Sequence, residues 1–327
     1  MERRSELRHD LVSGNWVLLS TRRGTRPHEI KNRPKRKATP IKDCPFERPF
    51  RDRSPIYLAG PKDNWRLSVV ANKYPAVVHS ARPVKNEHNG FYEPVKGTGH
   101  HELVLTRDHF KNFPKLSPDE AREVFHVFQE RYRDLAKEPE VAYVSIFHNW
   151  GPAAGASVFH PHYQILTVPI VPSYVERTLD TSENYFRKHK RSVHDVLMRY
   201  ELKKRKRIVY ENGEAVVLAP YVSREPFELR VYPKRTNPYF EDACEAEVFG
   251  VAAALQNALQ RLEKKLHDPD YNFLVHTAPV KDKERHHHYK WHIEIIPKLN
   301  IDAGFELGTG IEINTVDPDD AARILRS

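Results

Sequence analysis

The feature that most constrains the fold of this 327-residue chain is a succession of strand, helix, strand and strand that occurs twice. The first copy begins with an apolar segment at 101–109, which predicts a strand. An amphipathic helix follows Ser117, which together with Glu120 has the spacing of a capping box. Further strands are predicted at 143–149 and 162–169, where β-branched and aromatic residues predominate.

The second copy repeats this order about 130 residues later, with a strand at 228–237, a helix from about 242 to 266, and strands at 271–279 and 289–298. Duplication of one unit accounts for both copies. The sequence therefore predicts an α+β fold of two tandem units, each an antiparallel sheet with a packed helix. The boundary between them is expected in the connecting segment, which gives units at 1–175 and 176–327.

Two further segments have the pattern of a hairpin, in which a turn containing glycine separates two apolar runs. One turn is Ser13-Gly14 and the other is Asn212-Gly213. Between the two units, 181–206 is basic and is predicted to be helical, whereas 22–53 is rich in Arg, Lys and Pro and is expected to be irregular.

Composition bears on the cellular location expected for the chain. Its apolar residues (39%) suffice for a packed interior, and no apolar run is long enough to span a membrane. The N-terminus lacks the apolar segment of a signal peptide, and two cysteines cannot form a disulfide framework, so a cytoplasmic protein is expected. Of the two, Cys244 is expected in the core because it lies on the apolar side of a predicted helix.

The net charge of +9 raises the alternative of a nucleic-acid-binding protein, since 188–207 is strongly basic. No basic strand interleaved with aromatic residues accompanies this run, so a solvated helix face is the preferred interpretation. Local Arg and Lys side chains serve small anionic substrates equally well.

The segment with the clearest chemistry is 147–164, which reads FHNWGPAAGASVFHPHYQ. Small residues at 153–157 let the backbone approach a bulky anion and offer it N–H donors. His160 and His162 flank a proline, so one can support the site while the other acts as a nucleophile, and Gln164 adds an amide donor. The pattern predicts a site that binds a phosphate chain and attacks it with an imidazole. The second unit has Lys290-Trp291-His292 at the matching place, so chemistry is expected in the first unit.

Together with this segment, several others resemble galactose-1-phosphate uridylyltransferases, of the histidine-triad superfamily, over nearly the whole chain. The matching segments are RHDLVSGNWVLLSTRRGTRP, DCPFE, ANKYPA, GHHELVLTRDH, YKWHIEIIP and AGFELGTGIEIN. The resemblance implies that both units are histidine-triad-like and that the protein is a homodimer. Relatives of that family include phosphorylases of sugar nucleotides and of dinucleoside polyphosphates, which AGFELGTG resembles equally well.

The resemblance implies a double displacement in which His162 attacks the α-phosphorus of UDP-glucose and galactose-1-phosphate then takes the uridylyl group. Gln164 stands where histidine-triad hydrolases have a third histidine; a glutamine hydrogen-bonds a phosphate oxygen but does not supply a proton. This favours transfer over hydrolysis. The alternative is a phosphorylase that uses inorganic phosphate to cleave ADP-glucose or a dinucleoside polyphosphate. An assay that compares inorganic phosphate with galactose-1-phosphate as the acceptor distinguishes the two activities.

The resemblance also implies which side chains bind the substrates. Those matching phosphate, nucleoside and sugar contacts are Arg23, Arg26, Asn72, Lys73, Tyr74, Asn149, Gly155, Ser157, Glu306 and Glu312. The arginines suit a phosphate monoester, with a solvated basic loop as the alternative. Glu312 replaces a glutamine of the best-known uridylyltransferases, and nothing in ANKYPA distinguishes uracil from adenine, so sugar and base both stay open.

A structural zinc is the implied cofactor. Its expected ligands are Cys44, Glu47, His101 and His160, with Glu47 where relatives have a second cysteine. A site that has lost its metal is the alternative. At a second metal site of some relatives, His276 and His292 match, but Glu294 and Thr178 stand in place of a histidine and a glutamate. That second site is expected to be absent or altered.

Overall fold

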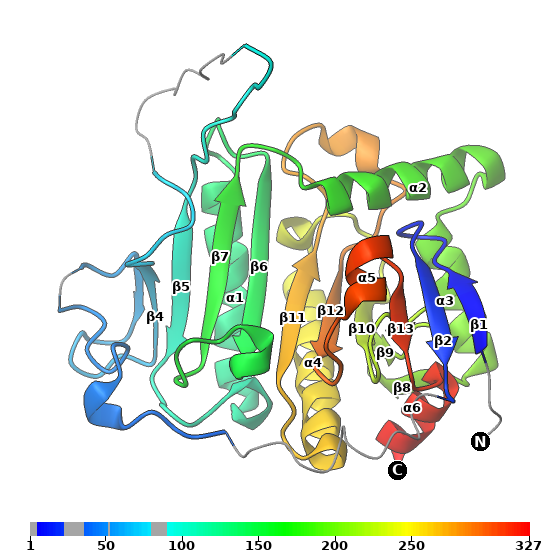
Figure 1. Cartoon of the computed structure of the whole chain (residues 1–327). Helices are drawn as coiled ribbons and strands as arrows, with labels where there is room; N and C mark the ends of the chain where they lie inside the picture. Colours follow the sequence, from blue (N-terminus) through cyan, green and yellow to red (C-terminus); the bar gives the residue numbers. More distant parts are fainter. Residues whose placement is uncertain (1–4, 23–35, 52, 80–89) are drawn as a thin grey trace.

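The computed structural model describes residues 5–22, 36–51, 53–79 and 90–327 (Figure 1). A ten-stranded sheet crosses the molecule. In spatial order its strands are β3 (Tyr57–Ala59), β4 (Leu67–Ala71), β5 (His101–Thr106), β7 (His162–Val168), β6 (Tyr143–Trp150), β11 (Tyr271–His276), β12 (His292–Pro297), β10 (Leu229–Pro233), β9 (Ala215–Leu218) and β8 (Ile208–Glu211). All neighbouring strands in it are antiparallel.

Two long helices, α1 (Pro118–Leu135) and α4 (Glu245–Leu266), lie behind this sheet in Figure 1. Each turns its apolar residues toward the strands, and together with the facing side chains they form one core that includes Phe128, Tyr163 and Leu255. The opposite face of the sheet carries the less buried members of β6 and β7. Function is therefore to be sought on the face that α1 and α4 do not cover.

The two predicted units are visible as β5-α1-β6-β7 and β10-α4-β11-β12, so the α+β prediction is confirmed. They share the sheet because β6 pairs with β11, with Asn149 opposite Asn272. The boundary near residue 175 stays a prediction, since the sheet continues without a break from one unit to the other.

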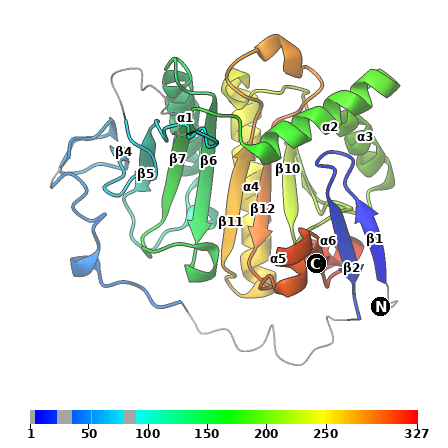
Figure 2. The same ribbon diagram turned by 45° about the horizontal axis from the view of Figure 1, so that its top comes forward.

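The N-terminal hairpin lies with the second unit. Strands β1 (Ser5–His9) and β2 (Trp16–Ser20) form a three-stranded sheet with β13 (Glu312–Asn314), which is parallel to β2. Figures 1 and 2 show this small sheet near the helices α2 (Ser173–His189), α3 (Val193–Lys204) and α6 (Pro318–Arg326). The turn predicted at Ser13-Gly14 and the hairpin predicted at Asn212-Gly213 are both present.

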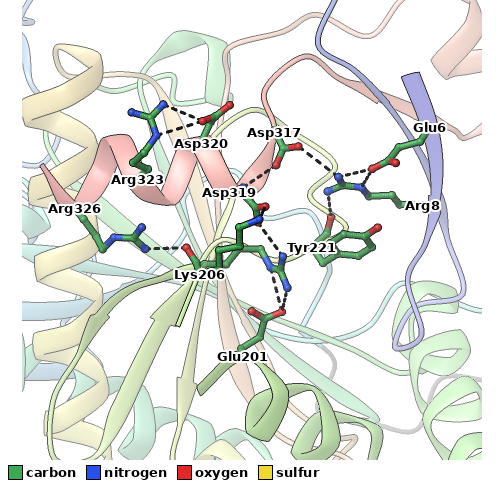
Figure 3. Close-up of polar contacts among 11 residues, drawn as sticks. Glu6, Arg8, Glu201, Lys206, Tyr221, Asp317, Asp319, Asp320, Arg323 and Arg326 are labelled. Carbon is green, nitrogen blue, oxygen red and sulfur yellow. Dashed lines mark hydrogen bonds and ion pairs between the residues drawn. The ribbon is translucent and has the colours of Figure 1, made fainter. Parts of the chain in front are cut away.

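Ion pairs fasten the C-terminal helix to this end of the molecule (Figure 3). Arg8 on β1 donates to the carbonyl of Tyr221, lies over its ring, and is 3.6 Å from Asp317 at the start of α6. On the helix itself, Asp319 binds Lys206 at 2.6 Å. These contacts hold the start of α6 against β1 and against Lys206, which lies just before β8.

Helix starts follow the local chemistry. At α1 the Oγ of Ser117 accepts from the backbone N–H of Glu120 at 3.2 Å, and Glu120 accepts from Ser117 N–H at 2.6 Å, as the capping box predicts. The prediction for Cys244 is wrong: it is the N-cap residue of α4 and is exposed, because the helix begins only at Glu245. Among the described residues, no helix is both long and apolar enough to cross a membrane.

Candidate active site

His162, the predicted nucleophile, is the first residue of β7 and is buried. Its Nδ1 lies 3.0 Å from the carbonyl oxygen of His160. A carbonyl oxygen can only accept, so Nδ1 carries the proton and the lone pair resides on Nε2. Burial lowers the pKa of His162, which keeps the imidazole neutral near pH 7. The geometry thus presents a neutral imidazole in one fixed tautomer.

The backbone of His162 is held from behind by His148 of β6. Nδ1 of His148 donates to the carbonyl oxygen of His162 at 2.8 Å, and the ring packs against Tyr163 on the core side of the sheet. Burial lowers the pKa of His148 to about 3, so this ring is neutral and acts as a hydrogen-bond donor. Sequence reasoning missed His148, because one histidine on a core-facing strand position carries no distinguishing signal.

Gln164 lies two residues along β7 on the same face as His162. Its Oε1 is 2.9 Å from Nε2 of His101, the first residue of β5. The backbone N–H of Ala76 donates to Nδ1 of His101 at 3.1 Å, so the ring proton is on Nε2 and is donated to Gln164. This fixes which end of the Gln164 amide is the acceptor and leaves its NH₂ group free to face a ligand.

The prediction that His101 is a metal ligand is therefore corrected. Both of its ring nitrogens are already hydrogen-bonded, Nδ1 to Ala76 and Nε2 to Gln164, and the ring lies within 3.4 Å of the Asn72 side chain. Asn72 belongs to the predicted nucleoside segment, so the structure does bring part of that segment to Gln164. The next two residues, Lys73 and Tyr74, are exposed beside it.

The small residues after β6 form a tight loop whose backbone depends on glycine. Gly151 has φ 88°, and a Cβ there would lie 2.0 Å from Oδ1 of Asp270. Asp270 in turn accepts from the backbone N–H of Ala153 at 2.7 Å. Gly155, at φ 84°, ends the turn, and Gly155 and Ser157 are both exposed. The loop is thus accessible and held in one shape.

Other predicted substrate residues are not beside His162 in this chain. Glu306 lies on α5 (Gly304–Thr309) and Glu312 on β13, and both views show these elements on the far side of β11 and β12 from β7 (Figures 1 and 2). Arg23 and Arg26 lie outside the described residues.

A cluster of metal-binding groups adjoins the site. Cys44, Glu47, His109 and His160 each offer one ligand atom, and these atoms all lie within 4.8 Å of one another. His109 takes the place predicted for His101. The predicted strand 101–109 has a histidine near each end, and the structure brings the later one to Cys44.

The donor set fits a cation. Nε2 of His160 donates to the carbonyl of Thr106 at 2.7 Å, and Nε2 of His109 is 2.8 Å from the carbonyl of Thr39. Both rings therefore direct an unprotonated Nδ1 into the cluster, toward Glu47 at 3.3 and 3.1 Å. Outer carbonyls that fix histidine tautomers in this way are typical of metal sites. Zinc accepts sulfur, nitrogen and carboxylate ligands in this combination.

A second cluster in the other unit has a different character. His276, His292 and Glu294 also have ligand atoms within 4.8 Å. The Glu294 carboxylate, however, is 2.7 Å from Arg224 and 3.0 Å from Arg230, and it also binds His276. These cations hold the pKa of Glu294 well below its usual range. The positive charge that a metal would supply is already present as guanidinium groups.

Comparison with known proteins identifies the family of this chain. A family model described as a domain of unknown function (DUF4921) matches residues 67–326. ADP-glucose phosphorylase of Arabidopsis thaliana is 30% identical over 98% of this chain and 92% of its own length. Galactose-1-phosphate uridylyltransferase of Thermotoga maritima is 28% identical, with 98% of each chain covered.

Solved structures give the same result. A crystal structure of an ADP-glucose phosphorylase from Arabidopsis thaliana with bound ADP-glucose superimposes with a TM-score of 0.84 at 28% identity, covering 99% of both chains. A uridylyltransferase mutant superimposes with a TM-score of 0.76 at 25% identity. Fold and site thus define an enzyme of the nucleotidyltransferase and phosphorylase class. The chain belongs to the galactose-1-phosphate uridylyltransferase-like family.

Proposed function

We propose that the protein transfers a nucleotidyl group from a sugar nucleotide to a phosphate-type acceptor through a nucleotidyl intermediate on His162. The observation that carries this proposal is the bond from Nδ1 of His162 to the His160 carbonyl, which leaves a lone pair on Nε2. A neutral, buried imidazole is a good nucleophile at neutral pH, and the bond it forms to phosphorus is labile enough to be transferred again.

In the first step Nε2 attacks the α-phosphorus of the donor. The new N–P bond replaces the bond from phosphorus to the bridging oxygen, and the hexose-1-phosphate leaves with that electron pair. In the second step an oxygen of the acceptor attacks the same phosphorus and the N–P bond breaks, which returns the lone pair to Nε2. Neither step needs a proton, because the leaving group and the acceptor are both phosphate anions.

The role proposed for Gln164 follows from this. With its Oε1 engaged by His101, its NH₂ group offers donors to a non-bridging oxygen on which charge develops. A glutamine cannot protonate a poor leaving group. The leaving groups that suit it are therefore phosphate monoesters, which need no proton. This favours transfer to another phosphate over transfer to water.

The favoured donor is ADP-glucose with inorganic phosphate as acceptor, giving ADP and glucose-1-phosphate. Its support is the similarity to ADP-glucose phosphorylase from Arabidopsis thaliana in sequence and fold, together with Glu312 in place of the usual glutamine. The second candidate is UDP-glucose with galactose-1-phosphate, supported by the similarity to the Thermotoga maritima uridylyltransferase. Galactose metabolism would be its setting.

The remaining expectations from sequence belong to the same proposal. Arg23, Arg26, Asn72, Lys73, Tyr74, Asn149, Gly155 and Ser157 would bind nucleotide and phosphates. Glu306 and Glu312 would contact the sugar of a site in a second copy of the chain, which makes a homodimer the proposed working form. Support for this is that α5 and β13, which carry them, lie on the far side of β11 and β12 from β7 of their own chain (Figure 1). A cytoplasmic location is proposed with it.

Zinc is the proposed metal, held by Cys44, Glu47, His109 and His160. When bound, it would fix the backbone of His160 and so the carbonyl that orients His162. The role of these residues is structural support for the site rather than contact with the substrate.

The test is a comparison of two complete reactions with one enzyme preparation. ADP-glucose with phosphate and UDP-glucose with galactose-1-phosphate are each supplied, and the nucleotide products are separated by chromatography. The proposal predicts ADP from the first reaction at the higher kcat/KM. UDP-galactose at the higher kcat/KM would establish the second candidate, and turnover of neither pair would contradict the proposal.

A further inference from the structure

One residue of the second unit contacts the small-residue loop (151–157) that follows β6 in the first. Asn272 of β11 lies opposite Asn149 of β6 in the register that joins the two units. Its Nδ2 donates to Oδ1 of Asn149 at 2.8 Å and to the carbonyl oxygen of Ala154 at 2.8 Å. Both hydrogens of this amide are therefore used, one on the side chain of Asn149 and one on the backbone of the loop.

These two bonds determine how both amides are turned. The Ala154 carbonyl can only accept, so the atom of Asn272 that faces it must be nitrogen. Because the same nitrogen faces Asn149, the atom that Asn149 presents to it must be oxygen. The NH₂ group of Asn149 then points the other way, toward the loop, where it lies 3.8 Å from the Cβ position of Gly155. One backbone carbonyl thus sets the orientation of two side chains.

We infer that Asn272 is a positioning residue that holds the Asn149 amide with its NH₂ group directed at the phosphates of the nucleotide. This rests on the proposed nucleotidyl transfer. Without Asn272, the Asn149 amide can turn over and present an oxygen to a phosphate oxygen, which is repulsive. Strand β11 then has a specific role, in which the second unit, lacking a His-Pro-His of its own, orients a donor in the first.

The contact to Asn149 is distinct from the general support of the loop. Asp270 holds the loop separately by accepting from the Ala153 N–H at 2.7 Å, and Asp270 is itself fixed by Arg36 at 2.6 Å. The loop therefore keeps this anchor when Asn272 is replaced by a side chain of similar size. The main consequence of such a replacement is the freed amide of Asn149.

The experiment measures the rate constant of nucleotidyl-enzyme formation in a single turnover with ADP-glucose and with UDP-glucose. The variants are Asn272→Leu, which is neutral and of similar size, Asn149→Ala, and the double variant. Asn184→Leu, at an exposed position of α2, is the matched control. Thermal unfolding reports whether each variant is folded. If Asn272→Leu does not fold, Asn272→Asp replaces it, because a carboxylate accepts hydrogen bonds but does not donate them.

We expect Asn272→Leu to slow formation of the intermediate by roughly 10- to 100-fold, with a smaller change in the donor concentration at half-saturation. In the Asn149→Ala background the same substitution should have no further effect, because the amide that it orients is gone. A full effect in that background would overturn the inference and assign the loss to the loop. A wild-type rate in the folded Asn272→Leu protein would also overturn it, whereas a wild type that forms no intermediate would overturn the proposed function as well.

Discussion

The two halves of the sheet place a histidine in the same local geometry but surround it differently. In the first, Nδ1 of His162 is 3.0 Å from the carbonyl of His160; in the second, Nδ1 of His292 is 3.0 Å from the carbonyl of Lys290. Two residues further along each strand stands Gln164 or Glu294. The backbone device that fixes the tautomer is therefore common to both units.

The surroundings decide what each histidine can do. His162 adjoins a small-residue loop that is exposed at Gly155, so a ligand can reach that side. His292 is stacked on Tyr232 at 4.8 Å and on His276 at 5.0 Å, and the neighbouring Glu294 is paired with arginines. Duplication thus leaves one unit with a histidine that follows an exposed loop and the other with a histidine in a charge-compensated interior.

The largest expected difference is between the two histidines themselves. His162→Ala should lower kcat by roughly 10⁴-fold or more, because no other group can form the N–P bond. His292→Ala should lower stability but keep kcat per folded molecule within about threefold of wild type. Steady-state rates normalised to the folded fraction measure both. Equal losses in the two variants would remove the distinction between the units.

Gln164 and Glu294, which lie two positions after these histidines, should differ in the same way, one in its effect on catalysis and the other in its effect on stability. Glu294→Gln leaves Arg224 and Arg230 with a neutral partner, so the free energy of unfolding should fall by roughly 3–5 kcal/mol. Gln164→Ala should instead lower kcat by about 100-fold at nearly unchanged stability. Urea denaturation and initial rates on the same preparations test this. A kinetic loss in Glu294→Gln at full folding would contradict it.

Metal content should distinguish the two clusters of potential ligands. We expect one zinc per chain, lost in Cys44→Ala and retained in His276→Ala, since arginines already compensate Glu294. Chelation should lower the free energy of unfolding by about 3 kcal/mol, the linkage expected for metal present at a few hundred times its dissociation constant. Elemental analysis of both variants gives the stoichiometry. Two metals per wild-type chain would show that the second cluster is also a site.

A smaller effect concerns acid stability of the second half. Burial lowers the pKa of His194 to about 3, and neither ring nitrogen has a hydrogen-bond partner among the described residues. Below pH 6.5 this histidine is protonated in the unfolded chain, where its pKa is near 6.5, but stays neutral in the folded chain. Stability should therefore fall by about 1.4 kcal/mol per pH unit for this group as pH drops below 6.5. His194→Phe should remove this contribution to the pH dependence of the free energy of unfolding, measured by urea denaturation at several pH values.

The smallest effect concerns the pH dependence of the reaction. The folded pKa of His162 is lowered by burial, and the neutral form is the nucleophile. Activity should be lost as pH falls through that lowered pKa, so the acidic limb of kcat/KM should lie below pH 6.5. Gln164→Ala should lower the whole profile without moving the limb. A limb above pH 7 would contradict a neutral, buried nucleophile.

Much of the fold could be predicted because apolar periodicity and turn glycines determine strands and helices locally. The site was predictable where several residues lie close in sequence, as from Asn149 to Gln164. His101 was predicted in the place that His109 takes in the cluster, because both lie at the ends of the predicted strand 101–109. Only the course of the chain there decides which of them lies near Cys44. Asn272 gave no signal, since its partners are set by a pairing between units that no local pattern specifies.

The most direct test of the central claim is intact mass spectrometry of wild type and His162→Ala after incubation with ADP-glucose and with UDP-glucose. We predict a nucleotidyl adduct on wild type alone, with adenylyl mass from the favoured donor, and its loss when phosphate is added. An adduct that persists on His162→Ala, or none on wild type with either donor under conditions that trap slow turnover, would contradict nucleotidyl transfer through His162.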